Sequence, residues 1–353
     1  MHINELLEKA VYGKASDIHI TSGIGAIARI HGKLIKLHEG TFVPDDTLEF
    51  AKQILSEKEL RIFAEAGEYD CSYSITGVSR FRVNVFRQRG SCALSFRVIA
   101  DRIPTIDELS LPPVLKELAN KPRGLILVTG PTGSGKSTSL AAMIDYMNTT
   151  RNCHIITIED PIEYLHAHKG CIVNQRQVGK DSLSFNNALR GALRQDPDVI
   201  LVGEMRDFET ISIALTAAET GHLVLSTLHT VGAAKTMDRI IDVFEPSQQP
   251  QIRVQLASVI EAVISQQILP RVDTQGRVAA FEIMTANSAI RALIREGKTH
   301  QMQTVIQTAA GENMVTMDSS LLSLYARGII SEGELLTRCV DDDMIRRQIG
   351  GRA

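Results

Sequence analysis

The segment from Gly130 to Thr138 has the residue types and spacing of a loop that binds phosphate. It fits the pattern G-x-x-x-x-G-K-[ST] at every fixed position. An apolar strand at Leu125–Val128 precedes it, and a helix at Ser137–Tyr146 follows it, so backbone N–H groups and the positive end of a helix would face the phosphates. We expect Lys136 to contact the β- and γ-phosphates and Ser137 to bind Mg²⁺. The predicted nucleotide-binding residues are Gly130, Pro131, Thr132, Gly133, Ser134, Gly135, Lys136, Ser137 and Thr138.

A carboxylate follows the second candidate segment, the apolar run Val199–Val202. Gly203 and Glu204 come next, and an acid at the end of a buried strand lies beside the metal at the carboxyl edge of a parallel sheet. We expect Glu204 to support Mg²⁺, either as a direct ligand or through a bound water molecule. The alternative is a strand-end glutamate that faces only solvent.

Three more carboxylates cluster after the predicted strand Ile155–Ile158. Hydrolysis needs a base that polarises the attacking water, in addition to groups that hold the nucleotide. We assign that role to Glu163 and expect Glu159 and Asp160 to line the nucleotide site. Without the phosphate loop upstream, the same cluster would be interpreted as a solvated turn.

Two histidines flank the apolar strand Leu223–Ser226. His229 follows the carboxyl end of the strand, at the sheet edge that carries the predicted phosphate site, and we assign it as a sensor of the γ-phosphate. His222 precedes the strand and should lie at the opposite edge, where capping or packing is an equal alternative.

Two arginines lie on the polar faces of strands nearer the N-terminus. Period-two alternation in residues 80–85 and 94–98 places Arg82 and Arg97 opposite the apolar side chains. Spacing alone favours a solvated face. The alternative is that these arginines contact the phosphates of a neighbouring subunit as arginine fingers.

The pattern of strands and helices expected around these residues predicts an α/β chain with two domains. Residues 1–100 form an α+β module with a mostly antiparallel sheet, a hairpin turn at His31-Gly32 and a helix N-terminus at Ser56. Residues 101–122 contain four prolines and form a linker with one helix. Residues 123–353 alternate apolar strands with helices, which predicts a parallel sheet with crossover helices, and the part after Gln248 is mainly helical apart from a strand at Val278–Ile283.

Composition argues against several classes of function without excluding nucleic-acid binding. The net charge of −3, the 5% aromatic content and the absence of Trp do not favour nucleic-acid binding. The five cysteines form no C-x-x-C pair, so we expect reduced thiols in a cytoplasmic protein and no zinc ribbon. No apolar run approaches the ~20 residues that span a bilayer, so no direct membrane insertion is expected and a partner would have to hold the chain at a membrane.

In their order along the chain, these motifs resemble those of the secretion ATPases of the type II/type IV pilus class. Gly130–Thr138 is similar to the Walker A motif of that family and Val199–Glu204 to its atypical Walker B motif. Glu159–Glu163 and Gly221–Thr230 resemble its "Asp box" and "His box". Four further stretches resemble its pilus retraction members, namely Ser16–His19, Arg80–Gly90, Val173–Arg176 and Ser288–Arg291.

The resemblance implies a small PAS-like α+β domain followed by a RecA-like P-loop ATPase domain, assembled as a homohexamer with ATP and Mg²⁺ between the domains. It implies that Arg82 and Arg97 complete the site, with Arg194 and Arg239 as weaker candidates. It also implies a motor that powers type IV pilus retraction and twitching motility, held at the cytoplasmic face of the inner membrane by a pilus platform protein.

Several alternatives remain open at this stage. A pilus assembly or type II secretion ATPase shares the chemistry, but such members usually add an N-terminal extension and a tetracysteine zinc motif, and neither is present in this sequence. An accessory retraction paralogue fits the same motifs. A nucleic-acid translocase on the same core and a nucleotide-gated scaffold with little turnover are the remaining candidates.

Overall fold

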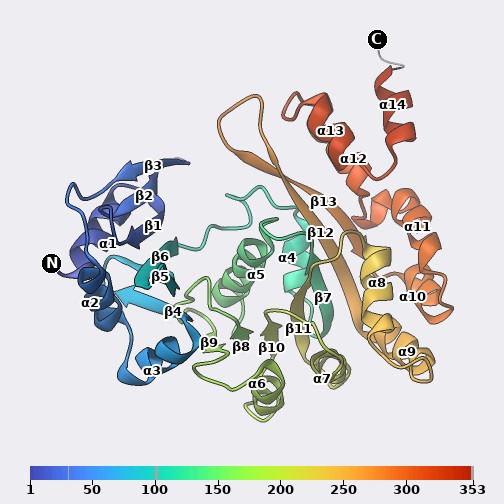
Figure 1. Ribbon diagram of the computed structural model, residues 1–353. Coiled ribbons are helices and arrows are strands. Elements are labelled where there is room, and N and C mark those ends of the chain that lie inside the picture. Colours follow the sequence, from blue (N-terminus) through green and yellow to red (C-terminus); the bar gives the residue numbers. More distant parts are fainter. Residues whose placement is uncertain (31, 100–101, 351–353) are drawn as a thin grey trace. The chain divides into compact units, whose positions relative to one another are not determined.

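The structure is a computed structural model that describes residues 1–30, 32–99 and 102–350. Contacts divide the chain into two compact units (Figure 1). The first unit comprises Met1–Arg102 together with Glu163–Leu165, and the second comprises Ile103–Ile162 and His166–Ala353. The expected turn residue His31, the last residue of the predicted first domain (100) and the first residue of the predicted linker (101) lie outside the described part of the chain.

The first unit is an antiparallel sheet with helices packed against it. Its six strands lie in the order β3-β2-β1-β6-β5-β4. Alternation along β5 buries Phe81, Val83 and Val85, and Phe81 meets Phe96 of β6 edge-on with 6.2 Å between ring centroids. The elements of this unit are α1 (Ile3–Tyr12), β1 (Ala15–Thr21), β2 (Ile27–Ile30), β3 (Lys33–Lys36), α2 (Pro44–Ile54), α3 (Glu57–Ala66), β4 (Glu68–Ile75), β5 (Ser79–Gln88) and β6 (Ser91–Ile99).

Local signals in this unit act as the sequence predicts. The Ser56 hydroxyl accepts a hydrogen bond from the backbone N–H of Glu59, and the Glu59 carboxylate accepts one from the backbone N–H of Ser56 at 2.8 Å. This reciprocal pair satisfies two backbone donors and begins α3 at Glu57. The predicted hairpin is formed by β2 and β3, which pair in antiparallel register.

The second unit contains a seven-stranded sheet in the order β13-β12-β7-β11-β10-β8-β9. All neighbouring strands are parallel except β12 and β13, which are antiparallel. Its strands are β7 (Gly124–Thr129), β8 (His154–Glu159), β9 (Ile172–Gln177), β10 (Val199–Val202), β11 (Leu223–Leu228), β12 (Ile260–Pro270) and β13 (Arg277–Thr285). Its α-helices are α4 (Val114–Ala119), α5 (Lys136–Thr150), α6 (Phe185–Ala192), α7 (Phe208–Glu219), α8 (Ala233–Asp242), α9 (Gln249–Val259), α10 (Ser288–Arg295), α11 (Met302–Thr308), α12 (Met317–Ala326), α13 (Glu332–Arg338) and α14 (Asp342–Gly350).

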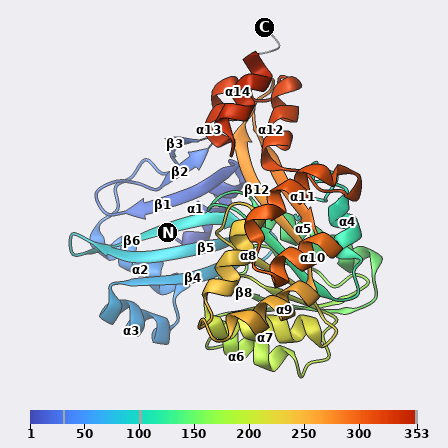
Figure 2. The ribbon, with the colours of Figure 1, turned by 90° about the vertical axis from the view of Figure 1, so that its right-hand side faces the viewer.

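Both faces of this sheet are covered, which explains the continuous apolar strands (Figure 2). Consecutive residues of β7 point to opposite faces, so Leu125 and Leu127 join one core cluster while Ile126 and Val128 join the other. Helices α7, α8 and α9 contribute to the first cluster, and α4 and α5 contribute to the second. Strand β7 is therefore packed on both faces, and the phosphate loop follows its carboxyl end.

Two strands of this sheet were missed by the sequence prediction. Strand β12 begins at Ile260 directly after α9 ends at Val259, with no Gly or Pro at this junction, so the sequence predicts helix through the segment. Strand β9 is one of the two edge strands of this sheet and carries the polar sequence IVNQRQ, which hides its period. Much of the segment expected as a linker is also packed, because Leu115, Leu118 and Ala119 of α4 are buried in a core cluster of the second unit.

No helix among the described residues has the length and apolar character needed to cross a membrane.

Candidate functional site

The phosphate loop joins the end of β7 to the start of α5. Gly130 has φ 140° and Gly135 has φ 86°, conformations that favour glycine. A side chain at Gly130 would place its Cβ 2.3 Å from the backbone oxygen of Gln266. Lys136 begins α5, and its ammonium donates hydrogen bonds to the carbonyl oxygens of Gly130 and Pro131 at 2.8 and 3.0 Å. The loop is therefore closed on itself with the lysine at its centre.

A buried glutamine on β12 packs against this loop and the helix that follows it. The side chain of Gln266 is 3% exposed, and its Oε1 accepts a hydrogen bond from the Ser139 hydroxyl of α5 at 2.8 Å. Its Nε2 lies 2.9 Å from where a Cβ of Gly135 would be. Gln266 is therefore bonded to the start of α5 and lies close against Gly135 of the loop, although the sequence prediction did not include it.

Glu204 follows β10 and contacts two cationic or potentially cationic groups. Its Oε1 accepts a hydrogen bond from Nε of Arg206 and lies 3.4 Å from Nε2 of His229. The hydrogen bond to Glu204 raises the pKa of Arg206 above its ordinary value. Glu204 and His229, both predicted, thus lie together, while Arg206 is a neighbour that the sequence prediction missed.

Hydroxyl groups on β11 hold the end of β10 in place. The Thr227 hydroxyl donates to the carbonyl oxygen of Gly203 at 2.6 Å, and the Ser226 hydroxyl donates to that of Val202 at 2.7 Å. Because β10 and β11 are parallel neighbours, these bonds fix the segment that carries Glu204 relative to the one that carries His229.

The predicted acids after β8 lie beside the Glu204 segment. Strands β8 and β10 are parallel neighbours, and the backbone N–H of Gly203 donates to the carbonyl oxygen of Ile158 at 2.8 Å. Glu159 accepts hydrogen bonds from the Thr157 hydroxyl at 2.6 Å and from Nε2 of Gln175 at 3.2 Å. Asp160 is exposed, and its charge helps to raise the pKa of Arg206. Glu159, Asp160 and Glu204 therefore share one edge of the sheet.

Magnesium is the metal that this arrangement would suit. Among the described residues, no group of three or more His, Cys, Asp or Glu side chains is placed to hold a metal ion. Mg²⁺ is commonly bound through one or two protein oxygens plus substrate phosphates and water. Ser137 is exposed in the first turn of α5, and Glu204 offers a partly exposed carboxylate, so both fit that mode of binding.

Two predicted arginines lie side by side on the first unit. Arg82 of β5 pairs directly with Arg97 of β6, so the two guanidinium groups share one face of the sheet. Nε of Arg97 donates to Oδ1 of Asp17 at 3.1 Å. Burial acts to raise the pKa of Asp17, but hydrogen bonds from Ser16 and Arg97 outweigh it and hold the pKa below its usual value. Arg82 is exposed and has no acidic partner among the described residues.

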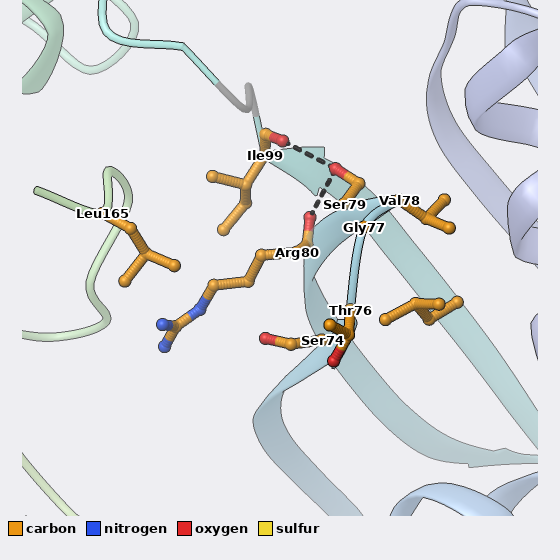
Figure 3. A pocket seen from close by; sticks show the side chains of 9 residues that line it. Ser74, Thr76, Gly77, Val78, Ser79, Arg80, Ile99 and Leu165 are labelled. Atoms are coloured by element: carbon orange, nitrogen blue, oxygen red, sulfur yellow. Dashed lines mark hydrogen bonds between the residues drawn. The ribbon is translucent and has the colours of Figure 1, made fainter. Parts of the chain in front are cut away.

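Glu163, the predicted base, is exposed and belongs with Tyr164 and Leu165 to the first unit. Leu165 lines a hollow of about 450 Å³ with Ile99 and the turn between β4 and β5 (Figure 3). Arg80 extends into this hollow and donates a hydrogen bond to the Ser72 hydroxyl at 3.1 Å. Leu165, which lies two residues after Glu163, is therefore beside the turn that precedes Arg82.

Other candidates lie away from the phosphate loop. His222 lies before β11, at the opposite edge of the sheet from His229, and its Nδ1 lies 2.9 Å from the carbonyl oxygen of Ala217. This contact fits capping of the end of α7. Arg194 and Arg239 are exposed, and neither contacts an acid or the phosphate loop in the described part of the chain.

Comparison with known proteins places this chain in a family. The family described as type II/IV secretion system protein matches residues 80–336. The chain is 48% identical over 331 residues to the type IV pilus retraction ATPase PilT of Pseudomonas aeruginosa, covering 94% of this chain and 96% of that protein. It is 48% identical over 324 residues to a twitching motility protein of Neisseria gonorrhoeae, covering 90% and 87%.

A solved structure and a more distant relative complete the comparison. A crystal structure of the pilus retraction motor PilT with bound ADP superposes with a TM-score of 0.93 at 47% identity, covering 98% of this chain and 99% of that one. The pilus assembly ATPase PilB of Pseudomonas aeruginosa is 36% identical over 284 residues, covering 75% of this chain and 47% of PilB. The chain therefore belongs to the type II/IV secretion system protein family, and its sequence and fold are similar to those of the pilus retraction ATPases over almost its whole length.

Proposed function

We propose that this chain is a Mg-ATP-hydrolysing motor that works as a homohexamer and powers type IV pilus retraction, the disassembly of pilin that drives twitching motility. The observation that carries the proposal is the near full-length similarity to pilus retraction ATPases in a chain with an intact phosphate loop. The higher identity to retraction ATPases than to an assembly ATPase favours retraction over assembly.

The phosphate loop binds the nucleotide. Lys136 exchanges its hydrogen bonds with loop carbonyls for bonds to the β- and γ-phosphates, and the N-terminus of α5 adds positive potential. Ser137 and Glu204 hold Mg²⁺, Glu204 directly or through water. When bound, Mg²⁺ neutralises charge that develops on the phosphates.

Hydrolysis uses residues from both units. Glu163 polarises the attacking water, and Glu159 and Asp160 line the nucleotide site. His229 senses the γ-phosphate and transmits its presence to Glu204, with which it is in contact. Arg82 and Arg97 contact the nucleotide of a neighbouring subunit and stabilise negative charge in the transition state.

Mechanical work follows from differential binding. ATP favours a closed arrangement and product release frees it, so each turnover moves a PAS-like domain of residues 1–100 against a RecA-like domain of residues 123–353. The joining segment is 101–122, of which α4 stays packed in the second domain. The hexamer acts at the cytoplasmic face of the inner membrane through a pilus platform protein.

Steady-state hydrolysis by purified variants tests the proposal. Glu163→Gln should lower kcat at least about 10²-fold while leaving ATP binding intact, because a general base contributes about 10²–10⁴ to the rate. Lys136→Ala should lose both binding and turnover. Lys235→Ala, which removes an exposed lysine of α8, is the matched control and should behave like the parent.

Three results would contradict the proposed function. Hydrolysis near the parental rate by Lys136→Ala would remove the phosphate loop from the reaction. A near-zero rate for the parent protein would instead support a nucleotide-gated scaffold, and stimulation by DNA would support a translocase.

A further inference from the structure

The helix that follows His229 begins without a side-chain cap of its own. Helix α8 starts at Ala233, and its N-cap residue, Gly232, offers no side chain to accept a hydrogen bond from the first backbone N–H groups. The first backbone N–H groups of a helix have no partner within it, and buried ones need an acceptor from elsewhere. The N-cap residue Gly232 lies three residues after His229, so a group that binds the backbone here also fixes the loop that carries the histidine.

Two buried residues from distant strands supply the acceptors. The backbone N–H of Gly232 donates to the Ser265 hydroxyl at 3.0 Å, and that of Ala233 donates to Oε1 of Glu282 at 2.8 Å. Ser265 and Glu282 pair directly across β12 and β13 and are 0% and 2% exposed. Ser265 also pairs with Thr129, the last residue of β7 before the phosphate loop. Side chains of these two paired strands therefore hold the first backbone N–H groups at the start of α8 in place.

Burying a carboxylate at position 282 is energetically unfavourable unless hydrogen bonds replace its lost hydration. Burial raises the pKa of Glu282, while the backbone N–H groups of Ala233 and Met317 and the side chain of Gln303 favour its ionised form. Met317 begins α12 and Gln303 lies on α11, so one carboxylate serves the N-termini of two helices. An apolar side chain at the same position would fill the space without desolvating a polar group, but it could not hold either helix N-terminus.

We infer that Glu282 is a positioning residue for His229, acting with Ser265 through the backbone of Gly232 and Ala233, and that it ties this loop to the start of α12. The inference rests on the proposed function, in which His229 senses the γ-phosphate. It assigns no catalytic contact to Glu282. The residue sets where the histidine lies relative to Glu204.

The test compares two substitutions of similar size. Glu282→Gln keeps one carbonyl acceptor for the N–H of Ala233, whereas Glu282→Met keeps none. We expect Glu282→Met to lower kcat roughly tenfold with KM for ATP within about twofold, and Glu282→Gln to recover most of that loss, because each lost hydrogen bond to a charged group has an effect of that order. Thr299→Val is the control, since Thr299 donates a partly buried hydrogen bond to Asp238 in the body of α8 and not to its N-terminus.

Combination with His229→Ala separates positioning from general damage. If Glu282 acts through His229, Glu282→Met should change kcat less than about twofold in the His229→Ala background, since coupled residues are not additive. Equal fold losses in both backgrounds, or a Thr299→Val variant as impaired as Glu282→Met, would overturn the inference.

Amide hydrogen exchange gives a readout that does not depend on hydrolysis. Glu282→Met and Ser265→Ala should each speed exchange in the peptide that contains Gly232 and Ala233, and Thr299→Val should not. Unchanged exchange there would overturn the inference even if the protein is an active ATPase. Absence of ATPase activity in the parent would defeat the proposed function, and the exchange result would still decide whether Glu282 holds this loop.

Discussion

Nε2 of His229 lies 3.4 Å from Oε1 of Glu204, although the two residues follow different strands. A γ-phosphate that contacts the histidine would thus act on the carboxylate proposed to support Mg²⁺. We predict that His229→Ala lowers kcat roughly tenfold or more, a loss typical of one electrostatic contact in a transition state. The matched control is His222→Ala, which removes a histidine from the other end of β11 and should stay within about twofold of the parent. Equal losses in both variants would remove the sensor role.

The hydrogen bond between Ser139 and Gln266 predicts a specific pattern of stability. Both side chains are buried, so Gln266→Leu leaves the Ser139 hydroxyl without its acceptor and should cost about 1–3 kcal/mol in the free energy of unfolding. Ser139→Ala should have a similar cost. The double variant should be less destabilised than the sum of the two, since it leaves no unpaired partner. Denaturation midpoints of the parent, the two single variants and the double variant, with and without ATP, measure these changes in stability. Strictly additive losses would show that the bond does not support the loop.

Arg82 and Arg97 allow a test of action between subunits. Arg82→Ala and Lys136→Ala should each lower hydrolysis strongly in a homohexamer, by about 10³-fold or more for an arginine that stabilises transition-state charge. In mixed hexamers, a site with an intact lysine can face a neighbour with an intact arginine. Mixing the two variants should therefore restore part of the activity. No recovery on mixing would show that Arg82 acts within its own subunit or only on the fold, and Arg29→Ala on β2 is the surface control.

His166 predicts a pH dependence of stability. Burial lowers the pKa of this histidine from 6.5 to about 4, so the folded chain keeps it neutral while the unfolded chain takes up a proton as the pH falls below 6.5. The stabilising contribution is complete above pH 6.5 and declines as the pH falls toward about 4, by about 1–2 kcal/mol between pH 6.5 and 5. Thermal midpoints of the parent should therefore fall more between about pH 7.5 and 5 than those of His166→Gln. Identical pH dependence in the two proteins would contradict this.

The phosphate loop and the strand ends were predictable because their signals are local. Gly130, Lys136 and Ser137 lie within one short segment, and a Gly-rich turn between an apolar run and a helix has few other solutions. Ser56 and Glu59 marked the start of α3 for the same reason. Period two also placed Arg82 and Arg97 on one face, and the register makes them direct neighbours.

The supports of the site were not predictable from spacing. Gln266 lies 127 positions from Ser139, and Glu282 lies 49 positions from Ala233, so neither pairing leaves a local pattern. The sequence predicts helix where β12 lies because α9 continues into the strand without a breaker, and this wrong prediction hides both Ser265 and Gln266. The available signal was the run of polar residues Ser265–Gln267 inside an apolar segment, which in a buried strand calls for nearby partners.

The central claim is that this chain powers retraction, and the most direct measurement is a clean deletion of its gene in the host, complemented with the parent or with Lys136→Ala. Surface pili would be counted and twitching motility measured in each strain. The account predicts more pili and no twitching after deletion, restored by the parent and not by Lys136→Ala. Bald cells after deletion would contradict it and identify an assembly motor.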